Sequence, residues 1–487
     1  MIVLSAVAVP LYHRLRIYTA YQYLEHRFDA RTRSLAALLF LLQRGLAAGL
    51  TIFAPAIILS TILGWNLYWT NLLVGGMVVI YTTAGGTRSV NFTHLLQMLI
   101  IFVAFGLAFY IALSRLPEPV GLWEAAHIAG KLGRLKAIDF SFDPNNRYTL
   151  WSGLLGGFFL QLSYFGTDQS QVQRYLTGRS VTHSRMALLA NGLLKIPMQF
   201  FVLSLGVLVF VFYQFHSRPI FFNTAELKAV RESPYRAEFK QVEGRFLSLQ
   251  QTRARRLLQF QQALQRNDQA QLALLRSQLE QLETQLEQVR AEAITVLKKS
   301  DPLLDPNDAN FVFLRFVLDY LPPGVVGLII AAIIAASMSS TASELNALAS
   351  TTVVDFYRRF YRTSADEKTL VRVSRWATVL WGAYAIVLAQ FASRLGSLIE
   401  AVNVVGSLFY GTILGIFCVA FFMRAVGGRA TFLAALIAQG LVFLAFAFTG
   451  MSFLWYNLIG CLSVMVLARL LQFTSFASQQ PPDQRPG

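Results

Sequence analysis

Long apolar runs separated by short polar segments make up most of the sequence. Ten of these runs approach or exceed the roughly 20 residues that an α-helix needs to cross the hydrocarbon core of a bilayer. They lie at 35–63, 67–84, 95–113, 150–165, 186–213, 325–349, 376–391, 398–423, 431–449 and 453–471. We therefore predict an all-α, polytopic membrane protein, because a helix satisfies every backbone polar group within its own segment.

A shorter apolar run, 2–12, precedes the first predicted span. No basic residue stands before it, no small-residue cleavage site follows it, and a basic cluster comes after it, so a signal peptide is not expected. With roughly 11 residues, the run is too short to cross a bilayer. We interpret it as the end of a span that begins further upstream.

Basic residues lie mainly in every second connection between the predicted spans. The connections on one side of ten alternating spans contain about 19 Lys and Arg, whereas the short connections on the other side contain about six. Short cytoplasmic loops are enriched in Lys and Arg, so the first set is predicted to be cytoplasmic. This set comprises 13–34, 85–90, 172–185, 357–375, 424–429 and the C-terminal end.

Composition separates the long connection after the fifth span from the rest of the chain. The whole chain is 55% hydrophobic and 14% charged, with a formal net charge of +16, whereas soluble domains carry about 25% charged residues. From His216 to Tyr320, 15 Lys or Arg and 13 Asp or Glu restore a soluble-like proportion. Elsewhere the excess positive charge lies in short loops, which excludes a nucleic-acid-binding domain.

The charged connection contains a coiled-coil pattern, with apolar residues at alternating steps of four and three. These residues are Leu275, Leu279, Leu282, Leu286, Val289, Ala293 and Val296. A single helix from Pro234 to Lys299 would be on the order of 100 Å long, yet both of its ends must return to neighbouring spans. We therefore predict two antiparallel helices that turn near 266–268.

This hairpin divides the membrane bundle in the sequence. Residues 1–215 are predicted to form a partial span and five spans, 216–312 the extracytoplasmic hairpin, 313–475 five further spans, and 476–487 a cytoplasmic tail. The hairpin either packs on itself and decorates a loop, or docks an extracytoplasmic protein partner.

Four stretches carry motifs that occur in the same order in one known protein family. The residues are Tyr18-Thr19 with Tyr23-Leu24-Glu25 and Arg27-Phe28; Gly64, Leu67, Tyr81, Thr82, Gly85, Gly86 and Ser89; Gly166-Thr167-Asp168-Gln169 with Val172-Gln173-Arg174-Tyr175-Leu176; and Ala335-Ala336-Ser337-Met338-Ser339-Ser340 with Ser343, Leu345, Asn346 and Asp355. Together they resemble the sodium/solute symporter family, most closely the branch that carries monocarboxylates, vitamins and iodide. The resemblance covers the chain apart from 216–312.

The resemblance implies an inverted-repeat helix bundle of the leucine-transporter type, with substrate and ion held mid-membrane at broken helices. It also implies sodium-coupled uptake of a small organic solute (a sugar, a carboxylate or a vitamin-like compound) across the plasma or inner membrane. Sodium ions, the solute and the lipid bilayer are then the expected partners, and sodium is the co-transported ion. The rival hypothesis is a truncated membrane sensor or scaffold of the same fold that does not transport.

The run from Leu150 to Tyr175 independently indicates a broken helix. Four glycines precede three polar residues at depth; the residues are Gly153, Gly156, Gly157, Gly166, Thr167, Asp168 and Gln169. A helix interrupted where its backbone lines a cavity has this pattern, and ordinary glycine-mediated helix packing is the alternative.

Ala336, Ser339 and Ser340 are the candidate sodium ligands. Their spacing of i, i+3 and i+4 places them on one helix face, and hydroxyl and carbonyl oxygens are ligands that sodium accepts. In the family, the matching positions supply half of the sodium site. From spacing alone, a small-residue packing face is the alternative interpretation.

The other half of that site comes, in the family, from the first helix of the first repeat. The family places two spans and the start of a third before the point that matches Ile2. Either the start codon was assigned too far downstream or the gene is truncated. We therefore expect a product that begins at Met1 to bind sodium poorly.

His94 and Ser343 are candidates for an ion path. The family usually has an aspartate at the position of His94 and, in members that carry two sodium ions, a serine at the position of Ala342. We therefore predict no second sodium site. A histidine titrates near neutral pH, which allows proton sensitivity; the alternative is a hydrogen-bonded polar residue near the cytoplasmic interface.

Five further residues are candidates for substrate contact or for charge compensation. The resemblance places Gln161, Tyr164, Lys195 and Asn403 at substrate-contacting positions of the family. An ion pair for the lysine, and interhelical packing or hydrogen bonding for the others, are the alternatives. Arg44 lies deep in its span without a family counterpart, and could either neutralise an anionic substrate or pair with a carboxylate of the bundle.

The sequence offers no signature of an enzyme. Its six histidines show no metal-ligand spacing, and neither a phosphate-binding glycine loop nor a nucleophile elbow is found.

Overall fold

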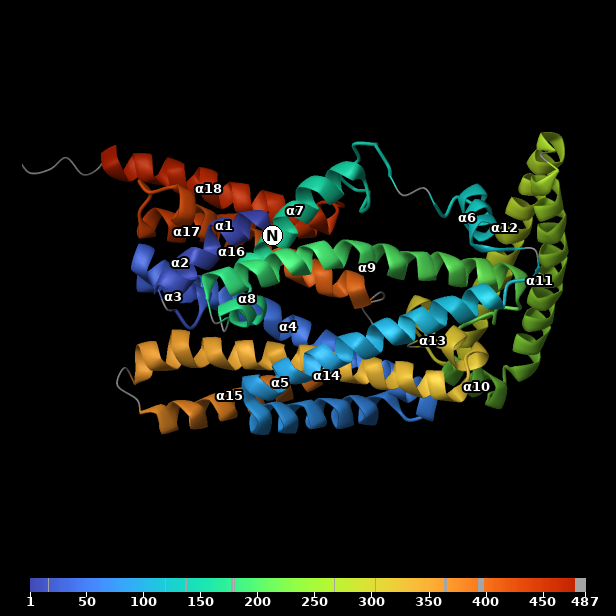
Figure 1. The fold of residues 1–487 in the computed structure, drawn as a ribbon, viewed down its shortest axis with the longest axis horizontal. Coiled ribbons are helices and arrows are strands. Elements are labelled where there is room, and N and C mark those ends of the chain that lie inside the picture. Colours follow the sequence, from blue (N-terminus) through green and yellow to red (C-terminus); the bar gives the residue numbers. More distant parts are fainter. Residues whose placement is uncertain are drawn as a thin grey trace, which may run out of the picture.

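The computed structural model describes residues 1–15, 17–118, 120–135, 138–176, 178, 180–266, 268–302, 304–362, 366–392 and 398–477, without the side chains at 85–97, 264–265 and 474–477. Within this part of the chain, every regular element is helical (Figure 1). The elements are α1 Ile2–Ala6, α2 Ala8–Leu15, α3 Ala20–Arg27, α4 Ala30–Leu63, α5 Leu67–Ser114, α6 Leu122–Lys131, the π-helical η1 Ser152–Gly156, α7 Gly157–Gly166, α8 Gln169–Leu176, α9 Val181–Phe215, α10 Thr224–Glu232, α11 Arg236–Gln265, α12 Gln269–Ser300, α13 Ala309–Tyr320, α14 Pro323–Thr351, the π-helical η2 Thr352–Tyr361, α15 Glu367–Ala389, α16 Leu398–Phe422, α17 Gly428–Phe448 and α18 Phe453–Ala477.

Seven helices in the described part are long and apolar enough to cross a membrane. They are Ala30–Leu63, Leu67–Ala84, Val181–Phe215, Pro323–Tyr361, Leu398–Phe422, Gly428–Phe448 and Phe453–Phe473. These seven helices confirm a multi-pass membrane protein.

The other three predicted spans are helical too, but differ from the prediction. The run 95–113 belongs to α5, the run 150–165 is divided between η1 and α7, and the run 376–391 continues a helix whose first half is charged. The connection predicted at 85–90 is helical, as part of α5. Gly85 and Gly86 lower helix propensity, but unlike proline they keep the backbone donors that a helix needs.

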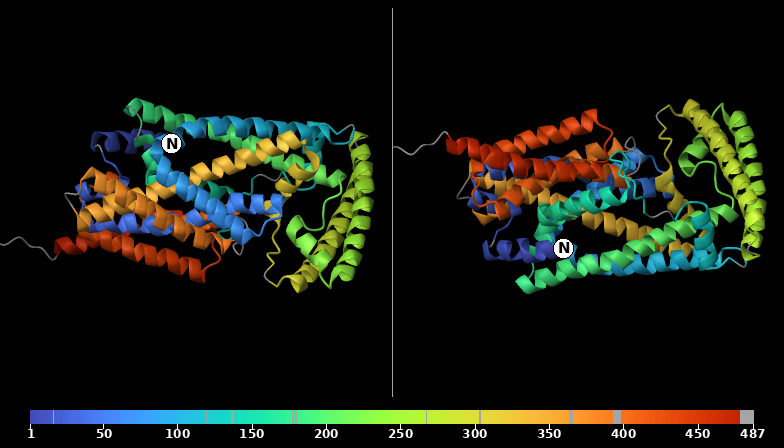
Figure 2. Two further views of the ribbon diagram at one scale, coloured as in Figure 1. Left: turned by 90° about the horizontal axis from the view of Figure 1, so that it is seen from below. Right: turned by 90° about the horizontal axis from the view of Figure 1, so that it is seen from above.

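The long helices lie side by side, and the pair α11 and α12 lies across one end of them (Figures 1 and 2). Within the bundle, small residues let helices approach closely. Gly411 and Gly415 lie one turn apart on α16. A Cβ atom at Gly411 would meet the carbonyl oxygen of Asn457 on α18 at 2.6 Å, so α16 and α18 pack backbone against backbone.

The helices α11 and α12 pair in antiparallel fashion. Lys299, near the end of α12, lies 2.6 Å from Glu238, near the start of α11. Leu286 and Val289 of the coiled-coil seam are buried against Phe239 and Phe246 of α11. The half of the apolar seam that is farther from the turn is therefore covered by the hairpin's own helices and by α10.

The half of the hairpin nearer its turn packs on the bundle. Leu275 and Leu279 share an apolar core with Ile128 of α6 and with Val209 and Phe212 of α9. The division of the chain at 215/216 and 312/313 and the cytoplasmic placement of 476–487 stay predictions; most of that last segment lies outside the described residues.

Candidate functional site

The helix predicted to be broken at Gly166–Gln169 is broken there. Helix α7 ends at Gly166 and α8 begins at Gln169, so Thr167 and Asp168 lie between two helices. The Oδ1 atom of Asp168 accepts hydrogen bonds from the backbone nitrogen of Ser170, at 2.8 Å, and from its hydroxyl, at 2.7 Å. Asp168 therefore caps α8 in the way that aspartate commonly caps a helix start.

Tyrosine hydroxyls donate hydrogen bonds to the backbone carbonyl oxygens that the break leaves without a helical partner. The hydroxyl of Tyr12 on α2 donates to the carbonyl oxygen of Gly166 at 3.1 Å, and that of Tyr21 on α3 donates to the carbonyl oxygen of Thr167 at 3.0 Å. Both tyrosines are fully buried. Backbone breaks at membrane depth are tolerated when such side chains satisfy the freed groups.

Asp168 also belongs to a buried cluster of charges centred on Arg44 of α4. The Arg44 guanidinium forms ion pairs with Asp168 and, at 3.0 Å, with Glu344 of α14. The three residues are 3%, 1% and 8% exposed. Of the two alternatives for Arg44, pairing with carboxylates of the bundle is therefore the one that the structure shows.

Tyrosine and threonine hydroxyls complete this cluster, which we call the Arg44 cluster (Arg44, Asp168, Glu344, Tyr410 and Thr51). Tyr410 of α16 donates to Oδ2 of Asp168 at 2.8 Å and accepts from Nη2 of Arg44 at 2.7 Å. Thr51 of α4 donates to Oε2 of Glu344 at 3.0 Å. The Arg44 cluster thus joins α4, the break, α14 and α16.

The predicted sodium ligands lie next to the Arg44 cluster. Ser339 is buried, and its hydroxyl donates to the carbonyl oxygen of Ala336 at 3.1 Å; Ser340 is half-buried. Ser340 and Glu344 are separated by one helical turn, or about 5–6 Å along the axis. The α14 face that carries the hydroxyls of Ser339 and Ser340 therefore also carries Glu344, one turn further along, whose carboxylate pairs with Arg44.

Ser343 lies on the same face of α14. It is buried, and its hydroxyl and carbonyl oxygens accept hydrogen bonds from Nε2 of Gln173 on α8, at 3.2 and 3.0 Å. The side chain of His94, the other ion-path candidate, lies outside the described residues.

The four predicted substrate contacts are placed differently. Tyr164 reaches the Arg44 cluster, with its ring centroid 5.7 Å from the Arg44 guanidinium carbon. Lys195 on α9 is half-buried, and its ammonium nitrogen lies 5.4 Å from the ring centroid of Phe165. Gln161 is exposed, and Asn403 is half-buried on α16. The structure therefore groups Tyr164 with the Arg44 cluster and leaves Gln161 exposed.

Glu344, Tyr410 and Thr51 were not identified from the sequence. Glu344 had a signal, because an ionisable residue inside an apolar helix of 29 residues is costly in lipid and is functional by default. Tyr410 and Thr51 had none, because a hydroxyl in an apolar helix is ordinary and its partner lies far away in the sequence.

A second ion cluster lies nearer the start of α4, towards the predicted cytoplasmic side. Near the start of α4, Arg33 donates through Nε to Oδ1 of Asp355 at 2.7 Å and pairs with Glu25 at 2.5 Å. Thr19 donates to the same Asp355 oxygen at 3.0 Å, and Arg359 pairs with Glu25 at 2.7 Å. Thr19, Glu25 and Asp355 come from two of the sequence motifs, which thus meet in space.

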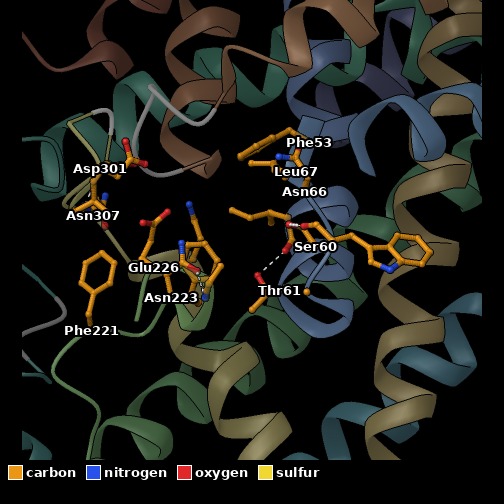
Figure 3. Close-up of a pocket in the computed structure, with 18 residues that line it drawn as sticks. Phe53, Ser60, Thr61, Asn66, Leu67, Phe221, Asn223, Glu226, Asp301 and Asn307 are labelled. Carbon is orange, nitrogen blue, oxygen red and sulfur yellow. Dashed lines mark hydrogen bonds between the residues drawn. The ribbon is translucent and has the colours of Figure 1, made fainter. Parts of the chain in front are cut away.

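A cavity of about 620 Å³ lies at the far end of α4, between the membrane bundle and the charged connection 216–312 (Figure 3). Figure 3 shows Ser60 and Thr61 on one side of it and Glu226 and Asp301 on the other. Burial, together with the negative charge of Asp301, raises the pKa of Glu226. None of the seven sodium and substrate candidates lines this cavity.

Comparison with known proteins relates this geometry to transporters. A model of the sodium:solute symporter family matches residues 1–229 and 304–438. The stretch that it leaves out contains α11 and α12.

Individual relatives of the chain are sodium-coupled transporters, in agreement with the family match. The chain is 25% identical over 428 residues to a sodium-dependent multivitamin transporter of Oryctolagus cuniculus (87% of this chain and 53% of the relative). It is 27% identical over 421 residues to sodium-coupled monocarboxylate transporter 1 of Mus musculus (86% and 55%). It is also 26% identical over 424 residues to the human (Homo sapiens) sodium/iodide cotransporter (86% and 52%). The chain therefore spans about half the length of these relatives.

The fold matches a solved structure, a substrate-bound outward-open state of a Na+-coupled sialic acid symporter. The TM-score is 0.72 at 20% identity, with 99% of this chain and 82% of that chain covered. The predicted all-α transporter fold is thereby confirmed.

Proposed function

The chain belongs to the sodium:solute symporter family, and from that premise we propose that it imports a small organic solute, driven by the inward sodium gradient. The observation that carries this proposal is the broken helix α7–α8 beside the hydroxyl face of α14, deep in an apolar bundle. Alternating-access transporters hold their substrate and ion at such breaks. The family and the relatives named above are transporters, not enzymes.

We propose that sodium is held by the carbonyl oxygen of Ala336 and the hydroxyls of Ser339 and Ser340. Support comes from their common face and from the burial of Ser339. Sodium bound there stabilises the state that accepts solute, and release to the sodium-poor cytoplasm reverses this effect. We propose a single sodium site, with His94 and Ser343 on the ion path.

We propose that Tyr164, Lys195, Asn403 and Gln161 contact the solute in the course of transport. A positively charged Lys195 favours a carboxylate or another solute with negatively charged or hydroxyl groups. The plasma or inner membrane is the proposed location, because the asymmetry of Lys and Arg between the connections favours a cytoplasmic side.

A protein that binds the hairpin from outside is a separate proposal. It is supported by exposed charged side chains on α11 and α12, such as Arg245 and Glu292. Capture of a partner by the wild-type protein but not by a hairpin-deleted variant would test it. A sensor or scaffold without transport is the less favoured alternative.

The test is uptake by proteoliposomes that contain the full-length protein, meaning residues 1–487 together with any in-frame residues encoded upstream of Met1. We expect uptake of one member of a panel of sugars, monocarboxylates and sialic acid in sodium but not in choline. Ser339→Ala and Ser340→Ala should each raise the sodium concentration for half-maximal uptake, by about tenfold or more. Ser350→Ala, on the same helix but away from the site, is the matched control. Uptake that is equal in sodium and choline would refute the proposal.

A further inference from the structure

The Arg44 cluster contains more negative than positive charge. Among the described residues, one guanidinium, Arg44, is in hydrogen-bond contact with two carboxylates, Asp168 and Glu344. Arg174 on α8 also acts on Glu344 electrostatically, more weakly than Arg44 does. A buried charge is costly unless an opposite charge is close. When both carboxylates are ionised, the cluster therefore has one negative charge that Arg44 does not balance.

The two carboxylates are not equally satisfied. Asp168 accepts hydrogen bonds from Ser170, Tyr410 and Arg44, so both of its oxygens are used. Glu344 receives Arg44 on Oε1 only, while Oε2 accepts from the neutral hydroxyl of Thr51. The unbalanced charge thus lies on the Glu344 side of the Arg44 cluster.

Glu344 also lies on the side of the proposed sodium ligands. Ala336, Ser339, Ser340, Ser343 and Glu344 follow the spacing i, i+3, i+4, i+7 and i+8, which is one stripe of a helix. Ser340 precedes Glu344 by one turn. A cation held by the hydroxyls and the carbonyl of this stripe is therefore within about one turn of a carboxylate, in a site where little water screens the attraction.

We propose that Glu344 is the charge partner of the transported cation, and that the cation and Arg44 share its carboxylate. This inference rests on the proposed sodium-coupled function and adds a residue to it. Serine hydroxyls and a carbonyl supply the ligand geometry, and Glu344 supplies the negative charge that those neutral groups lack. Binding of sodium then brings the net charge of the buried cluster to zero.

The test is direct binding of radioactive sodium ions to the purified full-length protein, which needs no solute. We expect E344Q to raise the half-saturating sodium concentration by about tenfold or more, and E344D to raise it less, because the charge is kept. E400Q changes a partly exposed glutamate that pairs with Arg147 at 2.5 Å, and it should leave sodium binding unchanged.

Two outcomes would overturn the proposal, and only one of them would also refute the proposed function. Wild-type affinity in E344Q, together with weakened binding in Ser340→Ala, would refute the role of Glu344 and leave the proposed function standing. Absence of sodium binding by the wild-type protein would refute both.

A second neutral variant covers the case in which E344Q does not fold. E344M fills a similar volume without a polar group, and buried ionic groups are often replaced in this way without loss of stability. A purely structural role would lower the melting temperature equally in sodium and in choline and would leave half-saturation unchanged. Loss of the sodium-dependent part of the melting temperature is the result that we expect.

Discussion

The bundle and the hairpin hold their ion pairs in opposite environments. In the Arg44 cluster, the paired side chains are at most 10% exposed, whereas the side chains of Arg245 and Glu292 on the hairpin are 51% and 50% exposed. An exposed pair contributes about 0–1 kcal/mol, but removing one member of a buried pair leaves a charge without compensation and costs about 3–5 kcal/mol. The same contact is a structural requirement in one region and dispensable in the other.

Apolar side chains show the reverse arrangement. The bundle turns many of them outward, including Ile80, Leu193 and Leu380, as expected of a surface that faces lipid. The hairpin buries Leu286 and Val296 between its helices, as expected of a domain in water. One region of the chain is thus built for lipid and the other for water. The bundle is sensitive to loss of a buried charge, and the hairpin is sensitive to loss of a buried apolar side chain.

Arg44→Ala should have the largest effect. It leaves Asp168 and Glu344 buried without their cation, so we expect a loss of about 3–5 kcal/mol of stability. Thermal unfolding in detergent, followed by size-exclusion chromatography, measures this loss. Arg245→Ala is the matched control on the hairpin and should change stability by less than about 1 kcal/mol. Equal effects of the two substitutions would contradict the comparison.

Leu286→Ala should destabilise the hairpin while sparing the bundle. Leu286 is fully buried, and truncation of a buried leucine costs about 2–5 kcal/mol. Faster proteolysis within 236–300, with unchanged sodium-dependent uptake, is the expected result. Leu247→Ala alters an exposed leucine of α11 and serves as the control. Loss of uptake in Leu286→Ala would mean that hairpin and bundle do not respond separately.

Glu226→Gln should have the smallest effect, and it should depend on pH. Because burial raises the pKa of Glu226 above its ordinary value of 4.5, the folded protein binds this proton more tightly than the unfolded chain does. The contribution of Glu226 to the free energy of unfolding is therefore fully present below pH 4.5 and is lost as the pH rises through the raised pKa. The variant should therefore melt at a higher temperature than wild type at pH 7 and at the same temperature near pH 4. A difference that persists at low pH would contradict this account.

The sequence predicted features that depend on local patterns. Apolar runs predicted the membrane bundle, and glycines followed by polar residues predicted the break at Gly166–Gln169. Both are local, because helix length and helix breaking depend on neighbouring residues. The run of Gly85 and Gly86 shows the limit of this reasoning, since a glycine pair weakens a helix without ending it.

Contacts between distant segments were out of reach. Arg44 and Glu344 are 300 positions apart, and no periodicity relates them. The sequence could show that each is an ionisable residue at depth, and so that each needs a partner. Which carboxylate Arg44 meets is decided by how α4, α14 and the break pack together.

The tyrosines at the broken helix have a consequence for water. Tyr12 and Tyr21 each place one hydroxyl on a carbonyl that no helix serves. With phenylalanine at either position, that carbonyl would need a water molecule, because a buried acceptor is rarely left empty. Two phenol groups from the first 21 residues therefore take the place that water molecules would otherwise fill at these two carbonyls. If α2 or α3 were drawn away from the break, these two carbonyl oxygens would need water as their donor.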